Sequence, residues 1–363
     1  MTLLIFSAGL ALLIVGAEAL VRGASRIALM LGVSPLIIGL TVVAFGTSAP
    51  ELAVSVKAAM SQQSEIALGN VVGSNVFNVL FILGVSALVT PLVVSRQLVR
   101  LDVPVMIAVS VGLLIVSMDG ELGRFDGLVL ISGLGVYLWF LASQSRKERR
   151  EQREESGETR TVDRTSGGWL IDSLLVVGGL AMLILGSRWL VDSAVSIAQA
   201  LGVSELVIGL TVVAAGTSLP EVVTSVIASL RGERDIAVGN VVGSNIFNIM
   251  AVLGVSCIVA PEGLSVPSAV IGFDLPIMIV VAFACLPIFF TGGVISRWEG
   301  GLLLGYYVAY TTYLILAASH HDAQPEFTGF MLYFAIPLTL VTLIVIAALE
   351  VRKQRVIGRI DNR

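Results

Sequence analysis

The sequence GLTVVAFGTSAPE, from Gly39 to Glu51, occurs a second time as GLTVVAAGTSLPE, from Gly209 to Glu221. The same offset of 170 positions relates two further blocks, GNVVGSNVFN from Gly69 to Asn78 and GNVVGSNIFN from Gly239 to Asn248. The chain is therefore an internal duplication. Each copy places one glutamate inside an apolar segment, directly after a Gly-Thr-Ser-x-Pro sequence, and these two acids require a physical explanation.

Composition identifies the class of protein. The chain has 363 residues, of which 56% are hydrophobic and only 13% charged, and its mean hydropathy is +0.95. Soluble domains carry about 25% charged residues, so the chain is predicted to be a polytopic membrane protein surrounded by the lipid bilayer. No nucleic-acid partner and no resident cofactor is expected.

The predicted fold is all-α, with two inverted-topology repeats of five transmembrane helices plus one extra C-terminal transmembrane helix. A bilayer requires about 20 apolar residues per helix, and the chain offers eleven such segments. Because five is an odd number of crossings, the second copy enters the membrane from the opposite side, as in many secondary transporters. The predicted spans are Leu3 to Leu20, Val33 to Ala59, Ile66 to Val89, Val103 to Met118, Phe125 to Ala142, Trp169 to Leu190, Val203 to Leu230, Ile236 to Val259, Ala269 to Phe290, Trp298 to Ala318 and Gly329 to Leu349.

Charged residues divide the chain and orient it. The predicted parts are a first repeat (1–144), a polar linker (145–168) that is partly helical at its start, a second repeat (169–318) and a C-terminal part (319–363). With the N-terminus outside, 19 of the 22 Lys and Arg residues fall on the cytoplasmic side, which includes the linker and the C-terminus. Cytoplasmic loops carry such an excess, which predicts this orientation. The short linker and the absence of organelle-targeting features favour a plasma (inner) membrane as the location.

The duplicated motif should break its helix in mid-membrane. Pro50 has no backbone N–H and Gly46 is a weak helix former, so carbonyls near Ala44 are freed. Within hydrocarbon, such a break is tolerated only where it lines a cavity or binds a ligand. Every group supplied is an oxygen, which suits Ca²⁺, Na⁺ or Mg²⁺ and argues against zinc or copper. The groups near this break and its second copy are those of Ala44, Thr47, Ser48 and Glu51, and of Ala214, Thr217, Ser218 and Glu221.

The two glutamates should meet where the repeats meet. Two close carboxylates in a low dielectric cannot both stay charged without compensation. One divalent cation, two or more monovalent cations, or protons would supply it. Such a site moves loaded with one set of ions or another, which is the physical basis of exchange.

The second pair of blocks brings further oxygens. Ser74 and Asn78 are four positions apart, as are Ser244 and Asn248, so each pair shares a helix face, and we expect these faces to point at the carboxylates. The alternative is purely structural: small residues packed at a helix crossing, with asparagine joining the helices by hydrogen bonds.

These paired blocks, in two inverted five-helix repeats with a cytoplasmic linker, resemble the sodium/calcium exchangers of the calcium/cation antiporter superfamily, most closely the prokaryotic members. The resemblance implies a non-enzymatic antiporter with four ion sites between the repeats and with the first helix of each repeat as a sliding gate. It assigns Ca²⁺ to Glu51, Glu221 and the carbonyls of Thr47 and Thr217. It assigns Na⁺ to the same glutamates, with Asn78 and Asn248 in the remaining central positions, and with the carbonyls of Ala44 and Ala214 and the hydroxyls of Ser48, Ser218, Ser74 and Ser244.

Other functions stay open at this point. Ca²⁺/H⁺ antiport could use the same two glutamates, although the sister branch with that activity carries an acid in its second block, and this chain has none there. An intramembrane hydrolase could use two carboxylates as acid and base, but it requires no broken helix in each copy. A channel requires no inverted pair of closed sites.

Overall fold

The computed structural model describes residues 2–156, 166–202, 208, 214–290, 292–319 and 321–342. Within these ranges, nine helices are long and apolar enough to cross a membrane, and a bent pair makes a tenth. The chain is an all-helical, multi-pass membrane protein, as the sequence predicts. The short apolar helix Leu219–Leu230 lies where the seventh span is expected.

The helices of the first copy follow the predicted order. Several are continued by a π-helical turn, labelled η. They are α1 (Thr2–Leu31), α2 (Pro35–Ile38), η1 (Gly39–Val43), α3 (Ala44–Thr47), α4 (Ala49–Met60), α5 (Ser64–Phe77), η2 (Asn78–Ile82), α6 (Leu83–Val89), η3 (Leu98–Asp102), α7 (Val103–Val116) and α8 (Arg124–Ser156).

The second copy repeats this order, and one further helix follows it. The elements are α9 (Ser166–Ala200), α11 (Ala214–Gly216), α12 (Leu219–Leu230), α13 (Arg234–Phe247), η5 (Asn248–Leu253), α14 (Gly254–Val259), η6 (Val270–Asp274), α15 (Leu275–Phe290), α16 (Arg297–Ala318), and then α17 (Gln324–Phe330) with η7 (Met331–Ala335). The last helix packs on α16, where the hydroxyl of Tyr306 donates to Thr339 Oγ1 at 2.7 Å.

The second span is broken where the motif predicts it. The segment Pro35–Thr47 and helix α4 meet at Ser48 with a bend of 45°. Pro50 lies in the first turn of α4, where a missing N–H removes no helical hydrogen bond. In the second copy α11 ends at Gly216 and α12 begins at Leu219. The preceding part of the predicted span Val203 to Leu230 lies outside the described residues, apart from Ile208.

The repeats are inverted, because their first helices cross antiparallel. Gly9 of α1 faces Gly186 of α9, and Gly16 faces Gly179. The residue number rises along one helix as it falls along the other. The backbones nearly touch, since a Cβ added to Gly16 would lie 2.8 Å from the carbonyl oxygen of Gly179.

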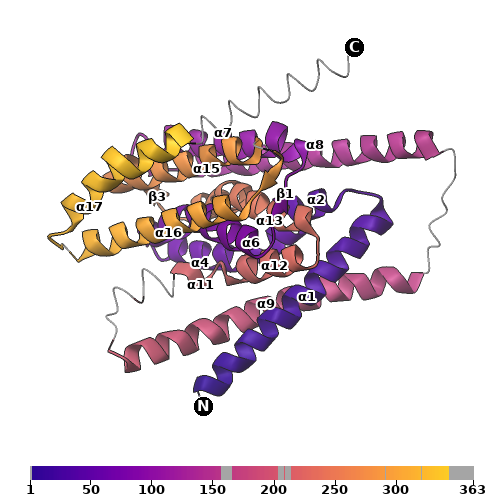
Figure 1. Cartoon of the computed structure of the whole chain (residues 1–363), viewed down its shortest axis with the longest axis horizontal. Coiled ribbons are helices and arrows are strands. Elements are labelled where there is room, and N and C mark those ends of the chain that lie inside the picture. The colour runs from indigo at the N-terminus through magenta and orange to yellow at the C-terminus, as the bar shows by residue number, and fades with distance from the viewer. Residues whose placement is uncertain are drawn as a thin grey trace, which may run out of the picture.

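Two small antiparallel ribbons tie the copies together at their loops. Strand β1 (Leu92–Val93) pairs with β4 (Val294–Ile295), and β2 (Glu121–Leu122) pairs with β3 (Leu264–Ser265). Each ribbon takes one strand from each copy, as a pseudo-two-fold axis requires. In Figure 1, α1 and α9 cross along one edge of the molecule, α17 lies at another, and α4, α6, α12 and α13 lie between them.

Burial places the duplicated blocks at the centre. Of an 18-residue apolar window in each segment, 78% is buried for Ser64–Val89 and 89% for Arg234–Val259. The corresponding shares are 39% for α1 and 6% for α16. The buried polar residues of these two segments therefore face protein and not lipid; they include Ser74, Asn75, Asn78, Asn240, Ser244, Asn245 and Asn248.

Helices α1 and α8 both extend beyond the ends of their predicted membrane spans. Helix α1 continues to Leu31, past the expected end at Leu20. No breaker occurs until Gly32, which has a positive φ of 60°, and Arg22 and Arg26 reach the surface from a continuing helix. Helix α8 continues past the predicted span end at Ala142 to Ser156, so the polar linker is helical at its start, as predicted, while residues 157–165 lie outside the described part of the chain.

Candidate cation site

The two motif glutamates are both fully buried. Glu51 lies in the first turn of α4 and Glu221 in the first turn of α12, and neither exposes any surface. Each carboxylate lies within hydrogen-bond distance of the serine in the motif of the other copy. An ionisable side chain inside a membrane protein usually serves a substrate or ion pathway, so these two residues define the candidate site.

Each glutamate accepts a hydrogen bond from the opposite repeat. Ser218 Oγ donates to Glu51 Oε1 at 2.9 Å, and Ser48 Oγ donates to Glu221 Oε1 at 3.1 Å. The second oxygen of each carboxylate, Oε2, is buried and has no hydrogen-bond partner among the described residues. Each acid is thus oriented by one oxygen and left with the other free to bind.

The threonines of the motif hold the helices together through their hydroxyls. Thr47 Oγ1 donates to Asn240 Oδ1 at 3.1 Å, and Thr217 Oγ1 donates to Asn70 Oδ1 at 3.2 Å. Asn70 Nδ2 in turn donates to the backbone oxygen of Glu51 at 3.1 Å. The predicted role of the threonines lies in their carbonyls, so these hydroxyl contacts leave it a prediction.

The second blocks deliver their oxygens to the same region. Ser218 Oγ also lies at hydrogen-bond distance, 3.1 Å, from Ser74 Oγ, which places Ser74 beside the Glu51 carboxylate. Asn78 and Asn248 lie where a π-helical turn begins in each copy, and such turns are frequent at functional sites. Three buried oxygens of these blocks have no partner among the described residues: Asn78 Oδ1, Asn248 Oδ1 and Ser244 Oγ.

The remaining predicted ligands are the two alanine carbonyls. The carbonyl of Ala44 already accepts from the N–H of Ser48 at 3.0 Å. The sequence suggested that the break frees this carbonyl, but the last turn of α3 still closes on it, so only the second lone pair of its oxygen is left for an ion. Ala214 begins α11, and its side chain and the residues before it lie outside the described part.

The donor set fits a hard cation. Five buried oxygens without a described partner come from both repeats, and they belong to carboxylates, carboxamides and a hydroxyl. Ca²⁺ takes about 6–8 such oxygens in flexible geometry. No cluster of three His, Cys, Asp or Glu side chains occurs among the residues that the structure describes.

Sequence reasoning missed four asparagines of the same blocks. Asn70 and Asn240 clamp the motif helices, while Asn75 and Asn245 bond across the repeats. The available signal was their recurrence at identical positions of both copies, since a carboxamide in an apolar helix needs a partner.

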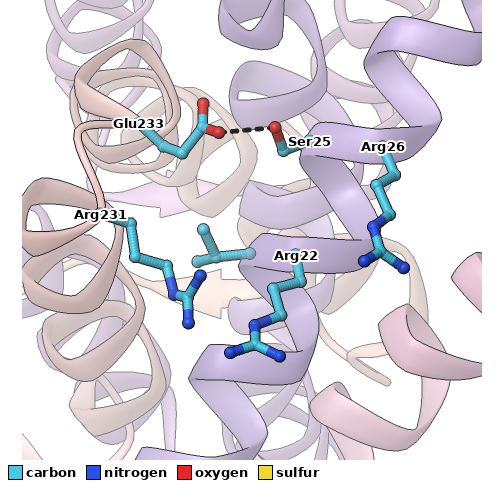
Figure 2. A pocket seen from close by; sticks show the side chains of 6 residues that line it. Arg22, Ser25, Arg26, Arg231 and Glu233 are labelled. Carbon is cyan, nitrogen blue, oxygen red and sulfur yellow. Dashed lines mark hydrogen bonds between the residues drawn. The ribbon is translucent and has the colours of Figure 1, made fainter.

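A separate pocket lies at one end of α1. It has a volume of about 350 Å³ and is lined by Val21, Arg22, Ser25, Arg26, Arg231 and Glu233, and none of the candidate cation ligands borders it. Figure 2 shows Ser25 of α1 bonded to Glu233 from the turn before α13, with Arg22 and Arg231 nearby. Glu18 forms ion pairs with both Arg22 and Arg231. The pocket is a charged contact between α1 and the second repeat.

Comparison with known proteins gives a consistent result. The model of a family described as sodium/calcium exchanger protein matches residues 1–142 and 172–316. The sodium/calcium exchanger MaX1 of Methanosarcina acetivorans is 35% identical over 343 residues, covering 86% of this chain and 97% of that protein. The inner membrane protein YrbG of Escherichia coli is 37% identical over 279 residues, covering 77% and 86%. A solved structure of the sodium-calcium exchanger NCX_Mj matches with a TM-score of 0.74 at 30% identity, covering 86% of this chain and 98% of that one.

Proposed function

Because this chain belongs to the sodium/calcium exchanger family, we propose that it is a secondary active antiporter that exchanges Na⁺ for Ca²⁺ by alternating access. The family is one of transporters and not of enzymes. The single observation that carries the proposal is the pair of buried glutamates, each held by a serine of the opposite repeat and each with one buried oxygen that has no hydrogen-bond partner among the described residues.

The charge of the site explains why it would exchange and not leak. Two carboxylates buried side by side need compensating positive charge, so a state without bound cations is disfavoured. One Ca²⁺ balances two carboxylates, whereas three Na⁺ leave one extra positive charge. Such a cycle responds to the membrane potential with about 2.3 kcal/mol per charge per 100 mV, and we expect it to be electrogenic and to extrude Ca²⁺.

The ligands divide between the two ions by chemistry. For Ca²⁺ we propose Glu51 and Glu221 together with the carbonyls of Thr47 and Thr217. For Na⁺ we propose the same acids with neutral oxygens, which a monovalent ion tolerates. These neutral oxygens are the carbonyls of Ala44 and Ala214, the hydroxyls of Ser48, Ser218, Ser74 and Ser244, and the carboxamide oxygens of Asn78 and Asn248.

Sodium is preferred over protons as the coupling ion because of the neutral groups around the acids. A proton carrier needs only the carboxylates, whereas this site surrounds them with unpartnered carboxamide and hydroxyl oxygens. Those oxygens have a clear use as ligands of a metal cation.

We further propose that the protein spans a plasma (inner) membrane with its N-terminus outside and its linker and C-terminus in the cytoplasm. The grouping of arginines in the fold supports this orientation. Arg22 and Arg26 at the end of α1 border one pocket with Arg231, and Arg234 borders a neighbouring pocket with Val93. Loops that are predicted to be cytoplasmic thus meet at one end of the molecule, as the positive-inside rule requires.

Transport into proteoliposomes tests the coupling ion. Vesicles loaded with Na⁺ are diluted into Na⁺-free buffer that contains radioactive Ca²⁺, beside matched vesicles that carry only a pH gradient. We expect the Na⁺ gradient alone to drive Ca²⁺ uptake, and uptake to rise when a potassium diffusion potential makes the vesicle interior positive, because Na⁺ leaving for Ca²⁺ carries net positive charge out. Uptake driven by the pH gradient alone would replace this proposal with Ca²⁺/H⁺ antiport.

A further inference from the structure

Four buried carboxamides form a closed network across the repeats. Asn78 Nδ2 donates to Asn245 Oδ1 at 3.0 Å, and Asn248 Nδ2 donates to Asn75 Oδ1 at 3.1 Å. Asn245 Nδ2 donates to the backbone oxygen of Asn75 at 3.3 Å, and Asn75 Nδ2 donates to the backbone oxygen of Asn245 at 3.2 Å. All four side chains are at most 2% exposed.

The direction of each hydrogen bond in the network is fixed, because two of the acceptors are backbone carbonyls. A carbonyl oxygen only accepts, so the Asn245 side chain must turn its Nδ2 toward Asn75 O. Its Oδ1 then faces Asn78, and an oxygen must be met by a donor. Asn78 therefore presents its Nδ2 to Asn245, and its own Oδ1 is turned away from the network.

Sulfur contacts support the same assignment. Asn245 Nδ2 also approaches Met106 Sδ at 3.5 Å, and Asn75 Nδ2 approaches Met278 Sδ at 3.6 Å. A thioether sulfur is a weak acceptor and not a donor. Both neighbours of each Nδ2 thus accept, so a flipped carboxamide would place oxygen against oxygen and sulfur.

The oxygens turned away are those without a described partner. Asn78 Oδ1 and Asn248 Oδ1 are buried and unpartnered among the described residues. Asn78 shares a helix face with Ser74, which bonds to Ser218 beside Glu51. Burying a carboxamide oxygen without a hydrogen-bond partner costs desolvation free energy. A cation bound to that oxygen would offset the cost.

We propose that Asn75 and Asn245 are positioning residues for transport: each fixes the carboxamide of Asn248 or Asn78 in the opposite repeat so that its oxygen, and not its nitrogen, faces the transported cation. The inference rests on the proposed function, since it assumes a cation at the site. In this proposal Asn75 and Asn245 bind no ion themselves. Each acts by orienting the carboxamide of the asparagine that it contacts.

A double-mutant cycle tests this relationship on the full chain in detergent. Asn245→Leu removes the acceptor for Asn78, and Asn78→Ala removes the carboxamide it orients. The readouts are the CaCl₂ and NaCl concentrations that give half of the cation-dependent rise in melting temperature, together with Na⁺-driven Ca²⁺ uptake. Ser256→Ala, at a buried polar position of α14 outside the network, serves as the matched control.

The expected result is a non-additive cycle. Asn245→Leu should raise the half-saturating concentrations about tenfold, and the double variant should bind no more weakly than Asn78→Ala alone. If Asn245→Leu does not fold, Asn245→Ser and the mirror pair Asn75→Leu and Asn248→Ala are judged by the same criterion.

Two outcomes would overturn the proposal. Unchanged half-saturating concentrations in Asn245→Leu, or effects that multiply in the double variant, would make Asn245 a merely structural residue while leaving the exchanger assignment intact. A wild-type protein whose melting temperature responds to neither CaCl₂ nor NaCl, compared with choline chloride, would instead contradict cation binding itself, and the positioning role would fall with it.

Discussion

Ser218 of one repeat donates a hydrogen bond to Glu51 of the other, with 2.9 Å between Ser218 Oγ and Glu51 Oε1. Ser48 and Glu221 make the reciprocal bond. A carboxylate has two oxygens, and this bond engages only one of them. Each serine thereby determines which oxygen of the opposite acid stays available.

Neutralising either glutamate should abolish transport. Glu51→Gln or Glu221→Gln keeps the volume of the side chain but halves the negative charge that balances a divalent cation. We expect Na⁺-driven Ca²⁺ uptake in proteoliposomes to fall to the level of empty vesicles. The control is Glu65→Gln, at an exposed acid in the first turn of α5, which should transport normally. Wild-type uptake by Glu51→Gln would refute the site.

Removing the serine hydroxyl should weaken cation binding without unfolding the protein. Ser218→Ala takes away the donor to Glu51 and a proposed Na⁺ ligand together. A hydrogen bond to a charged group contributes about 1.5–3 kcal/mol, so the half-saturating Na⁺ concentration should rise by at least tenfold. Ser229→Ala in α12, the helix that begins directly after Ser218, loses only a bond to the backbone of Ser225 and should leave that concentration unchanged. Equal effects of the two variants would contradict the assignment.

The contact between α1 and α9 should tolerate no added methyl group. In Gly179→Ala the new Cβ would lie 2.7 Å from both the oxygen of Gly16 and the nitrogen of Leu20. Overpacking of this kind costs about 1–3 kcal/mol, so the melting temperature should fall. Gly178→Ala is the control, because a Cβ at Gly178 meets no described atom within 4 Å. A normal melting temperature for Gly179→Ala would show that the two helices separate easily.

The ion pair between Glu18 and Arg231 should contribute little to stability. Both side chains are about one-third exposed, at 29% and 33%, and exposed pairs contribute at most about 1 kcal/mol. A cycle of Glu18→Ala, Arg231→Ala and the double variant, followed by thermal unfolding, should give a coupling below that value. The coupling should disappear at high choline chloride concentration. A larger coupling free energy that persists at high salt would indicate that this ion pair is shielded from solvent and holds α1 to the second repeat.

Much of the fold could be predicted because the same sequence pattern occurs in both copies. Hydropathy predicted the spans. The odd number of helices per copy predicted the inversion, and the antiparallel crossing of α1 and α9 at Gly16 and Gly179 confirms it. The break at Ser48 followed from Pro50. The extent of α1 could not be predicted, because bilayer thickness limits the apolar part of a helix but does not stop a helix from continuing into water.

The candidate site was predicted in its residue types and not in its bonds. Glu51 and Ser218 stand out in the sequence, but their pairing depends on the relative placement of two repeats, which no local pattern encodes. The Ala44 carbonyl shows the opposite limit. A proline was expected to free it, yet the last turn of α3 still bonds it to Ser48. The ion ligands themselves stay a prediction for the transport measurements.

Duplication usually supplies a spare, so that damage to one copy is covered by the other. The reciprocal bonds between the repeats remove that protection here. Ser48 serves Glu221, Asn245 serves Asn78, and Gly16 makes room for Gly179. A substitution in one copy therefore also alters the contacts of the other copy. Residues of the two halves that touch each other are expected to change together.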